Sequence, residues 1–424
     1  MKIVKILKGI ARRYNSVSLI LRIVCGLIVG TILGLALPGC AWIGTLGDLF
    51  TGALKAIAPI LVFVLVMSAL AQNSSKLDAR FGLVIWLYML TTFLAAFFAV
   101  VNSFLFPVGL TLAEAATADT VPQGIGEVMH NLLMNCVSNP VTSLANANYI
   151  GILFWAVMLG LAMKGIASDS TKVFLSNLAD AVSQGVRWII NLAPFGIAGL
   201  VFTNVSGNGL AIFTEYGKLL VLLVGTMLIV SLVVDPFVIF ITLKKNPYPL
   251  VWRCLKTSAV TAFFTRSSAA NIPVNMGLCE KLGLDRDFYS VSIPLGSTIN
   301  MDGAAVTIAI MTLACAHTMG ISVDFPSAMV LCILSTLGAC GASGVAGGSL
   351  LLIPMACSMF GISNDIAMQV VGVGFIIGVV QDSVETALNS SGDAEFTATA
   401  EYRQWEKDGK DLPYFLGGTR KLDI

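Results

Sequence analysis

The sequence predicts an all-α membrane protein with eight transmembrane helices and two re-entrant helical hairpins, the hairpins belonging to inverted repeats. The first observation is the composition: the 424 residues are 56% hydrophobic and only 12% charged, and the mean hydropathy is +0.86. Soluble domains carry about 25% charged residues, so most of this chain is suited to lipid. A net charge of +1 with no clustered basic face argues against nucleic acid as a partner.

The second observation is the length of the apolar stretches in the first half of the chain. Six of them can each cross a hydrocarbon core of about 30 Å, namely 17–37, 46–70, 81–107, 149–168, 186–205 and 216–243. The first is longer than the roughly 7–15 apolar residues of a secretory signal, so we expect it to be retained. A cytoplasmic N-terminus over 1–16 and six spans over 17–243 follow.

The third observation is the placement of basic residues outside these stretches. No lysine or arginine occurs between Arg80 and Lys164, and none between Arg286 and Arg403. Cytoplasmic loops carry the excess of basic residues in membrane proteins. The segment 108–148 is therefore expected to be external, and both termini cytoplasmic.

Two hairpins follow from the same rule. It makes Lys256 and Lys281 both cytoplasmic, although the chain between them is too short for two full crossings at 1.5 Å per residue. A re-entrant hairpin over 250–280, with its tip at 265–271, fits this constraint. A second hairpin over 324–364 starts from the outside and has a Gly/Ser-rich tip.

Each hairpin is followed by a span with a polar centre, over 287–318 and 365–395. A hairpin and an interrupted span that occur twice, in opposite directions, are typical of inverted-repeat secondary transporters. The segment 244–395 is therefore expected to be a transport core, followed by a cytoplasmic tail over 396–424.

Polar side chains mark one face of the last span. They recur at offsets of 0, 3, 4, 7 and 11, within a roughly 100° arc of a helix, and are Asp382, Glu385, Thr386, Asn389 and Asp393. A charge at the centre of a bilayer costs about 2.5–3.5 kcal/mol, so such residues are functional by default. We expect them to surround a cavity that holds a cation and a zwitterion together.

The span 287–318 carries Asn300 and Asp302, which point about 200° apart on an intact helix. For both to face one ion, the helix must unwind over 300–303, and unwinding frees backbone carbonyls. Carboxylate, amide and carbonyl oxygens are the hard ligands that a small cation needs. A weaker sign is a trio of hydroxyl groups on one face of the third span, Tyr88, Thr91 and Thr92.

Arg266 is the basic residue at the first hairpin tip, and it needs an acidic partner, for which Asp382 and Glu385 are the candidates. Free N–H groups and helix N-termini at both tips favour an anion such as a substrate carboxylate. Ser267 and Ser268 add hydroxyls. One Gly/Ser-rich tip alone is equally a device for close helix packing, whereas two facing tips beside buried charges favour a binding site.

Two other classes of protein fit parts of this pattern. Gly341–Gly344 matches the G-x-S-G of rhomboid-like intramembrane serine proteases, but these need a histidine on a later span, and both His130 and His317 precede Ser343. The two histidines are also too far apart for a metal site, and no enzyme is expected. A passive channel also uses polar re-entrant loops, and its flux would be indifferent to a sodium gradient.

The nine cysteines are scattered, odd in number and free of any C-x-x-C. Most are expected to be small apolar residues within helices. Cys40 and Cys136 lie on the side expected to be external and could pair.

Three motifs stand out: Thr-Arg-Ser-Ser at 265–268, Gly-Ser-Thr-Ile-Asn-Met-Asp-Gly at 296–303 and Asn-Ser-Ser-Gly-Asp at 389–393. With the order of spans and hairpins, they resemble the dicarboxylate/amino acid:cation symporter family, the glutamate-transporter-like carriers, over nearly the whole chain. The resemblance implies a sodium-coupled symporter whose elevator-type transport domain moves against a trimerising scaffold. It also implies a homotrimer in the bilayer of the bacterial inner (plasma) membrane, with Na⁺ co-transported and no other cofactor.

The resemblance also implies roles for individual residues. One sodium site would use Asp393 with backbone groups of Gly296, Asn300 and Asn389. A second would use Asp302, Asn300, Tyr88, Thr91 and Thr92, and a third Thr298 and Met301 with carbonyls of Ala339 and Ala342. Substrate main-chain groups would meet Ser267, Ser268, Gly344, Asp382, Thr386 and Asn389. Asp382 would take the ammonium and Asn389 the carboxylate.

Departures from the family pattern bear on the substrate. Glu385 stands where dicarboxylate carriers have an arginine, Ala304 where they have a threonine, and Ala346 where they have a proline at the outer tip. Losing a cation and gaining a carboxylate makes an acidic substrate side chain unfavourable. Glu385 is therefore expected to line the side-chain pocket, and small neutral hydroxy-amino acids, serine and threonine, are the expected substrates. If Arg266 neutralises Glu385, the departure argues more against glutamate than for serine, and proton coupling, other neutral amino acids or dicarboxylates stay open.

Overall fold

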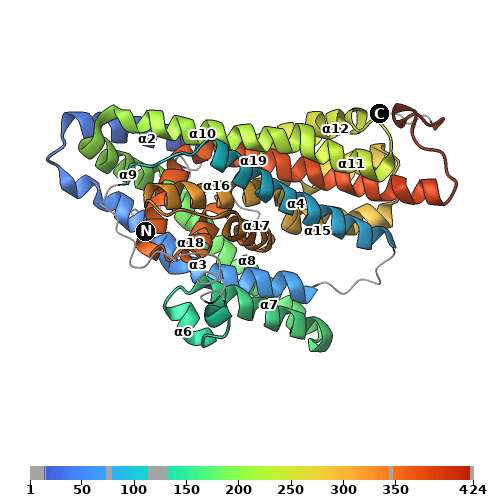
Figure 1. Cartoon of the computed structure of the whole chain (residues 1–424), viewed down its shortest axis with the longest axis horizontal. Helices are drawn as coiled ribbons and strands as arrows, with labels where there is room; N and C mark the ends of the chain where they lie inside the picture. Colours follow the sequence, from blue (N-terminus) through green and yellow to red (C-terminus); the bar gives the residue numbers. More distant parts are fainter. Residues whose placement is uncertain are drawn as a thin grey trace, which may run out of the picture.

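The computed structural model describes residues 14, 16–72, 79–112, 130, 133–342 and 347–420. Over these residues the regular structure is helical, and the β structure is limited to an isolated bridge between Pro413 and Arg420. Figure 1 shows α10 (Ile212–Ile229) and α11 (Asp235–Leu243) following one another along the long axis beside α19 (Asn364–Lys407), while α6 (Pro140–Ala145) and α7 (Tyr149–Ile166) project from the lower side of the view. The predicted all-α membrane architecture is confirmed at this level.

The first half of the chain forms helices near the expected positions, except for Asp169–Asn191, most of which lies where no span was expected. They are α2 (Leu19–Ala36), α3 (Thr45–Gln72), α4 (Ala79–Leu105), α7 (Tyr149–Ile166), α8 (Asp169–Asn191), α9 (Ala193–Asn208), α10 (Ile212–Ile229) and α11 (Asp235–Leu243). A π-helical turn, Val230–Val234, joins α10 to α11 without a break. Short elements are η1 (Ala41–Ile43), α6 (Pro140–Ala145) and η2 (Gly209–Ala211).

The expected span 186–205 differs from the structure. The chain there is divided at Leu192, where α8 ends and α9 begins. Pro194 lies in the first turn of α9, a position that proline tolerates because the N–H it lacks has no partner within the helix there. The apolar stretch that looked continuous in the sequence is therefore the end of one helix and most of the next.

The second half of the chain consists of helices broken at polar points. They are α12 (Tyr248–Cys254), the π-helical Leu255–Ala259, α13 (Val260–Thr265), α14 (Ser268–Lys281), α15 (Arg286–Ile299), α16 (Asp302–Thr318), α17 (Phe325–Ala339), η5 (Ser349–Leu352), α18 (Ile353–Ser358), α19 (Asn364–Lys407) and η6 (Tyr414–Leu416). The turn from α13 to α14 lies at the expected tip, where Arg266 has a left-handed φ of 50° and the Ser267 hydroxyl caps α14.

The last helix is longer than the expected span 365–395. α19 continues to Lys407, and Phe396, Tyr402 and Trp405 on this extension are buried. The Tyr402 hydroxyl donates to the carbonyl of Leu282 at 2.9 Å, which fastens the extension to the end of α14. The first part of the segment expected as a tail, 396–407, therefore continues this helix, and its aromatic residues pack against the core.

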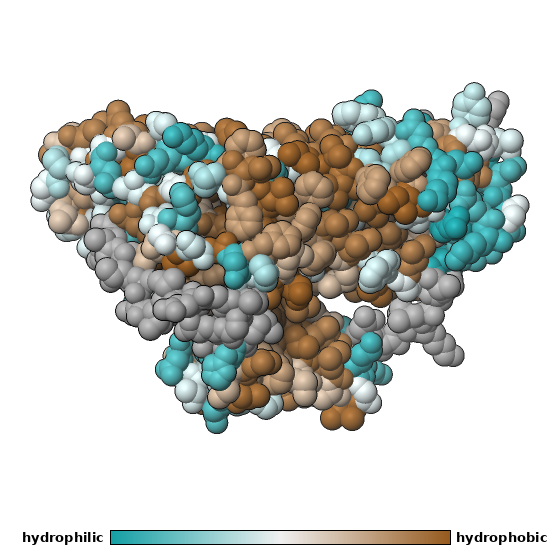
Figure 2. Space-filling model, viewed as in Figure 1, coloured by the Kyte–Doolittle hydropathy of each residue, from teal (hydrophilic) through white to brown (hydrophobic). Residues whose placement is uncertain are grey.

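Seven helical stretches of the described chain are long and apolar enough to cross a membrane. One of them, 193–243, includes Gly209, whose φ of 66° ends α9 and separates it from α10. Figure 2 shows apolar side chains over the middle of one face and hydrophilic ones gathered at the right-hand end, where the C-terminal residues lie. The chain is a multi-pass membrane protein.

The candidate spans differ greatly in burial. Only 22% of the residues in the apolar window of Leu19–Ala36 are buried, against 94% for Arg286–Thr318 and 83% for Asn364–Lys407. The helices that carry the polar motifs therefore form the interior, surrounded by the apolar outer helices. This arrangement keeps the buried acids away from lipid, as intramembrane carboxylates require.

Candidate functional site

The break between α15 and α16 is the centre of the site. α15 ends at Ile299, Asn300 and Met301 leave the helical conformation, and α16 begins at Asp302. The unwound segment is shorter than the predicted 300–303, because Gly303 already lies in α16. Its N–H, which has no partner in the first turn of a helix, donates to Asn389 Oδ1 at 2.8 Å.

Asn300 connects this break to α19. Its Nδ2 donates to the Asn389 carbonyl and to Asp393 Oδ1, both at 3.1 Å. A Cβ on Gly296 would lie only 2.7 Å from Asp393 Oδ1, so glycine permits this close approach. Asn300 Oδ1 and Asp393 Oδ2 are buried and accept no hydrogen bond. The residues of the first expected sodium site thus lie together with unpaired acceptor oxygens.

Asp302 is held from α4. Thr92 Oγ1 and Thr91 Oγ1 donate to its Oδ1 at 2.6 and 3.4 Å, and its Oδ2 is buried without a partner. Tyr88, expected in the same group, lies elsewhere: its hydroxyl donates to the Asp393 carbonyl at 3.1 Å and lies 2.9 Å from Thr397 Oγ1. Tyr88 therefore belongs with Asp393, whereas the two threonines accompany Asp302.

The third expected group is brought together only in part. The Cys340 Sγ lies 3.5 Å from the Ile299 carbonyl, which places the end of α17 against the end of α15. Ala339 and Ala342 are buried beside it. The Thr298 hydroxyl is exposed and donates to the Leu295 carbonyl of its own helix at 2.8 Å.

Asp382 joins the two predicted tips. Arg266 Nε donates to its Oδ2 at 2.7 Å, and the N–H of Gly347 donates to its Oδ1 at 3.0 Å. Of the two candidate partners for Arg266, the structure shows Asp382 and not Glu385. Gly344, Ser343 and Ala346 lie outside the described residues, so the expected role of Gly344 is not placed.

Glu385 is surrounded by neutral donors. Its Oε2 accepts hydrogen bonds from Gln381 at 2.5 Å, Thr307 at 2.7 Å and Ser349 at 2.9 Å. None of these three residues was among the predicted site residues. Only Gln381 left a signal, since it lies four positions before Glu385 on the same helix face.

The other expected substrate residues lie at the same site. The Asn389 Nδ2 approaches Met301 Sδ at 3.4 Å, a weak contact that leaves its N–H groups available. Ser268 is buried in the first turn of α14. Thr386 Oγ1 donates to the Asp382 carbonyl of its own helix at 2.7 Å.

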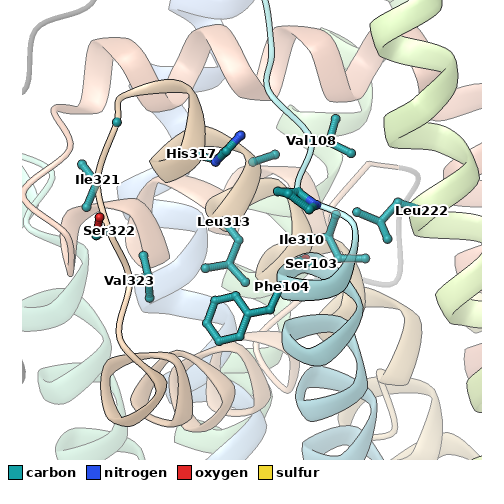
Figure 3. Close-up of a pocket in the computed structure, with 13 residues that line it drawn as sticks. Ser103, Phe104, Val108, Leu222, Ile310, Leu313, His317, Ile321, Ser322 and Val323 are labelled. Carbon is teal, nitrogen blue, oxygen red and sulfur yellow. The ribbon is translucent and has the colours of Figure 1, made fainter.

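A separate pocket lies between α4, α10 and α16 (Figure 3), with a volume of about 400 Å³. His317, Leu313 and Ile310 of α16 line it, together with Ser103 of α4 and Leu222 of α10. The residues predicted for cation and substrate binding do not line it. Cys40 and Cys136 are both free thiols, so the pairing left open by the sequence is not formed.

The interior of this bundle of apolar helices contains interrupted helices, unpaired buried carboxylate oxygens and an aspartate that joins two helical tips. Together these features define a membrane transporter. The chain belongs to the sodium:dicarboxylate symporter family, whose model matches residues 19–402.

Similar proteins have been named in several bacteria. A protein of Bifidobacterium adolescentis named serine/threonine transporter SstT is 67% identical, over 98% of this chain and 96% of its own length. Proteins with the same name in Streptococcus thermophilus and Streptococcus agalactiae are each 58% identical, over 95% and 93% of this chain and 100% and 98% of their own lengths.

Proposed function

We propose that this chain is a sodium-coupled symporter that imports small neutral amino acids, L-serine and L-threonine. The observation that carries the choice of substrate is the charge distribution around α19. Arg266 forms an ion pair with Asp382, and the Glu385 carboxylate accepts hydrogen bonds from three neutral donors. The names of the relatives support the same substrates.

The physical argument concerns what a substrate side chain would meet. Among the described residues, no basic side chain forms an ion pair with Glu385. An acidic substrate would place a second carboxylate near this one in a medium of low dielectric, where like charges repel strongly. A serine or threonine hydroxyl can instead donate to a carboxylate oxygen. Asn389 and the α14 N-terminus are suited to the substrate carboxylate, and Asp382 to its ammonium.

Sodium coupling is supported by the unpaired oxygens. Asp393, Asn300 and Asp302 each leave one buried oxygen without a hydrogen bond. A buried acceptor without a partner costs about 1–3 kcal/mol, which a bound cation offsets. We assign one sodium ion to Asp393 with Asn300, Asn389 and Gly296, and a second to Asp302 with the two threonines. We propose a third ion at Met301 with the carbonyls of Ala339 and Ala342; Thr298, expected there as well, donates to its own helix.

For the whole carrier we propose eight spans, two re-entrant hairpins with tips near Arg266 and Gly344, and both termini in the cytoplasm. The Gly209 turn supports counting 193–243 as two spans. The exposed apolar α2 and the buried α16 and α19 support a scaffold that surrounds a moving core. A homotrimer and an elevator mechanism in the bacterial plasma membrane complete the proposal.

Uptake into proteoliposomes tests this function. Radiolabelled serine should accumulate above its external concentration when a sodium gradient is imposed, and threonine should compete while aspartate does not. Asp393→Asn should raise the sodium concentration for half-maximal uptake at least about tenfold, because it removes a charged ligand. Glu280→Gln, on the exposed end of α14, is the matched control. Equal accumulation in potassium-only buffer on both sides would contradict sodium coupling.

A further inference from the structure

The hydrogen bonds that Glu385 accepts all fall on one of its two carboxylate oxygens. Oε2 accepts from Thr307 Oγ1 at 2.7 Å, from Ser349 Oγ at 2.9 Å and from Gln381 Nε2 at 2.5 Å. Among the residues that the structure describes, none donates to Oε1. Glu385 therefore has one oxygen that protein donors occupy and one that can still accept a hydrogen bond from a ligand.

The neighbouring acid Asp382 is arranged differently. Its Oδ2 accepts from Arg266 Nε at 2.7 Å, and its Oδ1 accepts from the N–H of Gly347 at 3.0 Å. The hydroxyl of Thr386, the residue after Glu385, donates to the Asp382 carbonyl of its own helix. Of the four oxygens of these two carboxylates, Glu385 Oε1 is thus the one without a donor in the described part of the chain.

The hydrogens of the three donors are all used within this group. A hydroxyl has one hydrogen, and a primary amide nitrogen has two. Gln381 Nε2 donates one of its two to Glu385 Oε2 and the other to Thr307 Oγ1, at 2.7 Å. Thr307 therefore accepts from Gln381 and donates to Glu385, and Ser349 gives its single hydrogen to the same carboxylate. The group can accept a hydrogen bond from a substrate but has no hydrogen left to donate one.

Close packing holds this group in place. A Cβ on Gly303 would lie only 2.8 Å from the Glu385 Cα, so the first turn of α16 lies directly against this part of α19. Thr307 is four positions further along, on the same face of α16. Ser349 is the first residue of η5, which packs on both α16 and α19. Three segments that are far apart in the sequence therefore meet at one carboxylate and fix its orientation.

We propose that Glu385 Oε1 accepts the hydroxyl hydrogen of the substrate, and that Thr307, Ser349 and Gln381 are positioning residues that occupy Oε2 and keep Oε1 available. The inference rests on the proposed function for the class of substrate, and on these hydrogen bonds for the atom that recognises it. A site built to bind a hydroxyl rejects an analogue without one, because its desolvated oxygen then has no donor. Alanine, which lacks only the hydroxyl of serine, should therefore bind more weakly.

Binding of serine and alanine to the purified full chain tests this inference. Each amino acid is titrated in sodium chloride, and its dissociation constant is obtained from the rise in melting temperature with concentration. The wild type should bind serine at least about tenfold more tightly than alanine. Thr307→Val should weaken serine binding about fivefold or more, because Glu385 is no longer held in place, and should change alanine binding less than about twofold. Thr307→Ser restores the hydroxyl and should bind both as the wild type does.

Two further variants extend the comparison. Ser349→Ala should act as Thr307→Val does and carries the test if that variant does not fold. Glu385→Gln should reduce the preference for serine, because the three donors would hold its amide oxygen at the Oε2 position and leave its NH₂ where the acceptor was. Adding Thr307→Val to Glu385→Gln should then change the preference no further. The matched control is Thr399→Val, a buried threonine of α19 whose hydroxyl donates to its own helix.

Three results would overturn the inference and leave the proposed function standing. Equal binding of serine and alanine by the wild type would show that the hydroxyl is not recognised. A full preference for serine in Glu385→Gln would place the hydroxyl elsewhere. Equal weakening of serine and alanine in Thr307→Val and Ser349→Ala would show that these residues have a purely structural role. A wild type that binds neither amino acid would refute the proposed function as well, so the two failures can be told apart.

Discussion

At the scale of single residues, we propose that selectivity depends on two carboxylates one turn apart on α19, Asp382 and Glu385. The charge of Asp382 is balanced by Arg266 at 2.7 Å. Glu385 is held by Thr307, Ser349 and Gln381, which donate hydrogen bonds but carry no charge. Neutral donors stabilise a carboxylate without cancelling its field. With both acids ionised, the cluster would keep one negative charge in excess, and we propose that this charge selects against acidic substrates.

Changing that charge should change the substrate. Glu385→Arg combined with Ala304→Thr should shift preference from serine toward aspartate by at least about tenfold, or about 1.4 kcal/mol, because it adds a cation and a hydroxyl donor. The measurement is competition by unlabelled aspartate against radiolabelled serine. Glu385→Gln removes the charge without adding one and should give an intermediate result. Unchanged competition in both variants would show that the side-chain pocket lies elsewhere.

At the scale of the elements, close contact between helices fixes the outer part of the molecule. α2 lies directly on α9, and a Cβ added at Gly30 would come within 2.4 Å of the Ala198 carbonyl oxygen. Gly26 has an equally close neighbour in Pro194, at 2.2 Å. Small residues four positions apart let two membrane helices approach closely, and there van der Waals packing supplies the association energy.

Alanine substitutions should therefore change the stability of the folded protein differently at a glycine packed against a neighbouring helix and at a glycine with open space beside it. Gly30→Ala should destabilise the folded protein by about 1–3 kcal/mol, since backbone must move to admit the methyl group. Gly217→Ala, on α10 where a Cβ meets nothing within 4 Å, should be neutral or stabilising by up to about 1 kcal/mol. Thermal unfolding in detergent gives both values. A Gly30→Ala protein as stable as the wild type would refute this view of the α2–α9 contact.

At the scale of the whole molecule, α19 crosses from the core to the outer helices. Its first turn carries Asp365, which forms an ion pair with Lys55 of α3. Both side chains are partly or largely exposed, so the pair contributes about 0–1 kcal/mol and breaks readily. If α19 moves with the core and α3 stays in the scaffold, as the elevator proposal requires, this contact exists in only one arrangement of the carrier.

Locking this contact should stop transport. In a background without the native cysteines, Lys55→Cys and Asp365→Cys should be joined by a short crosslinker that attaches through disulfides. Serine uptake should then fall to the level of empty vesicles, and a reductant, which cleaves the disulfides, should restore it. Each single-cysteine variant treated in the same way is the control. Uptake that survives complete crosslinking would show that α3 and the start of α19 move together.

Much of this protein was determined by local patterns in its sequence. Apolar length predicted α2, α3, α4 and α7, because a membrane helix must satisfy its own backbone and cover about 30 Å. The two-residue spacing of Asn300 and Asp302 predicted the break between α15 and α16, since an intact helix cannot turn both inward. Helical periodicity predicted the polar stripe on α19. Each of these inferences depends only on residues that are near one another in the chain.

The tertiary structure decided which of these pieces meet. It placed Arg266 on Asp382 instead of Glu385, Tyr88 beside Asp393 instead of Asp302, and Thr307 and Ser349 around Glu385. These contacts join helices far apart in sequence, and helical periodicity specifies the face of a helix but not the partner of that face. Packing of the interior helices chose the partners.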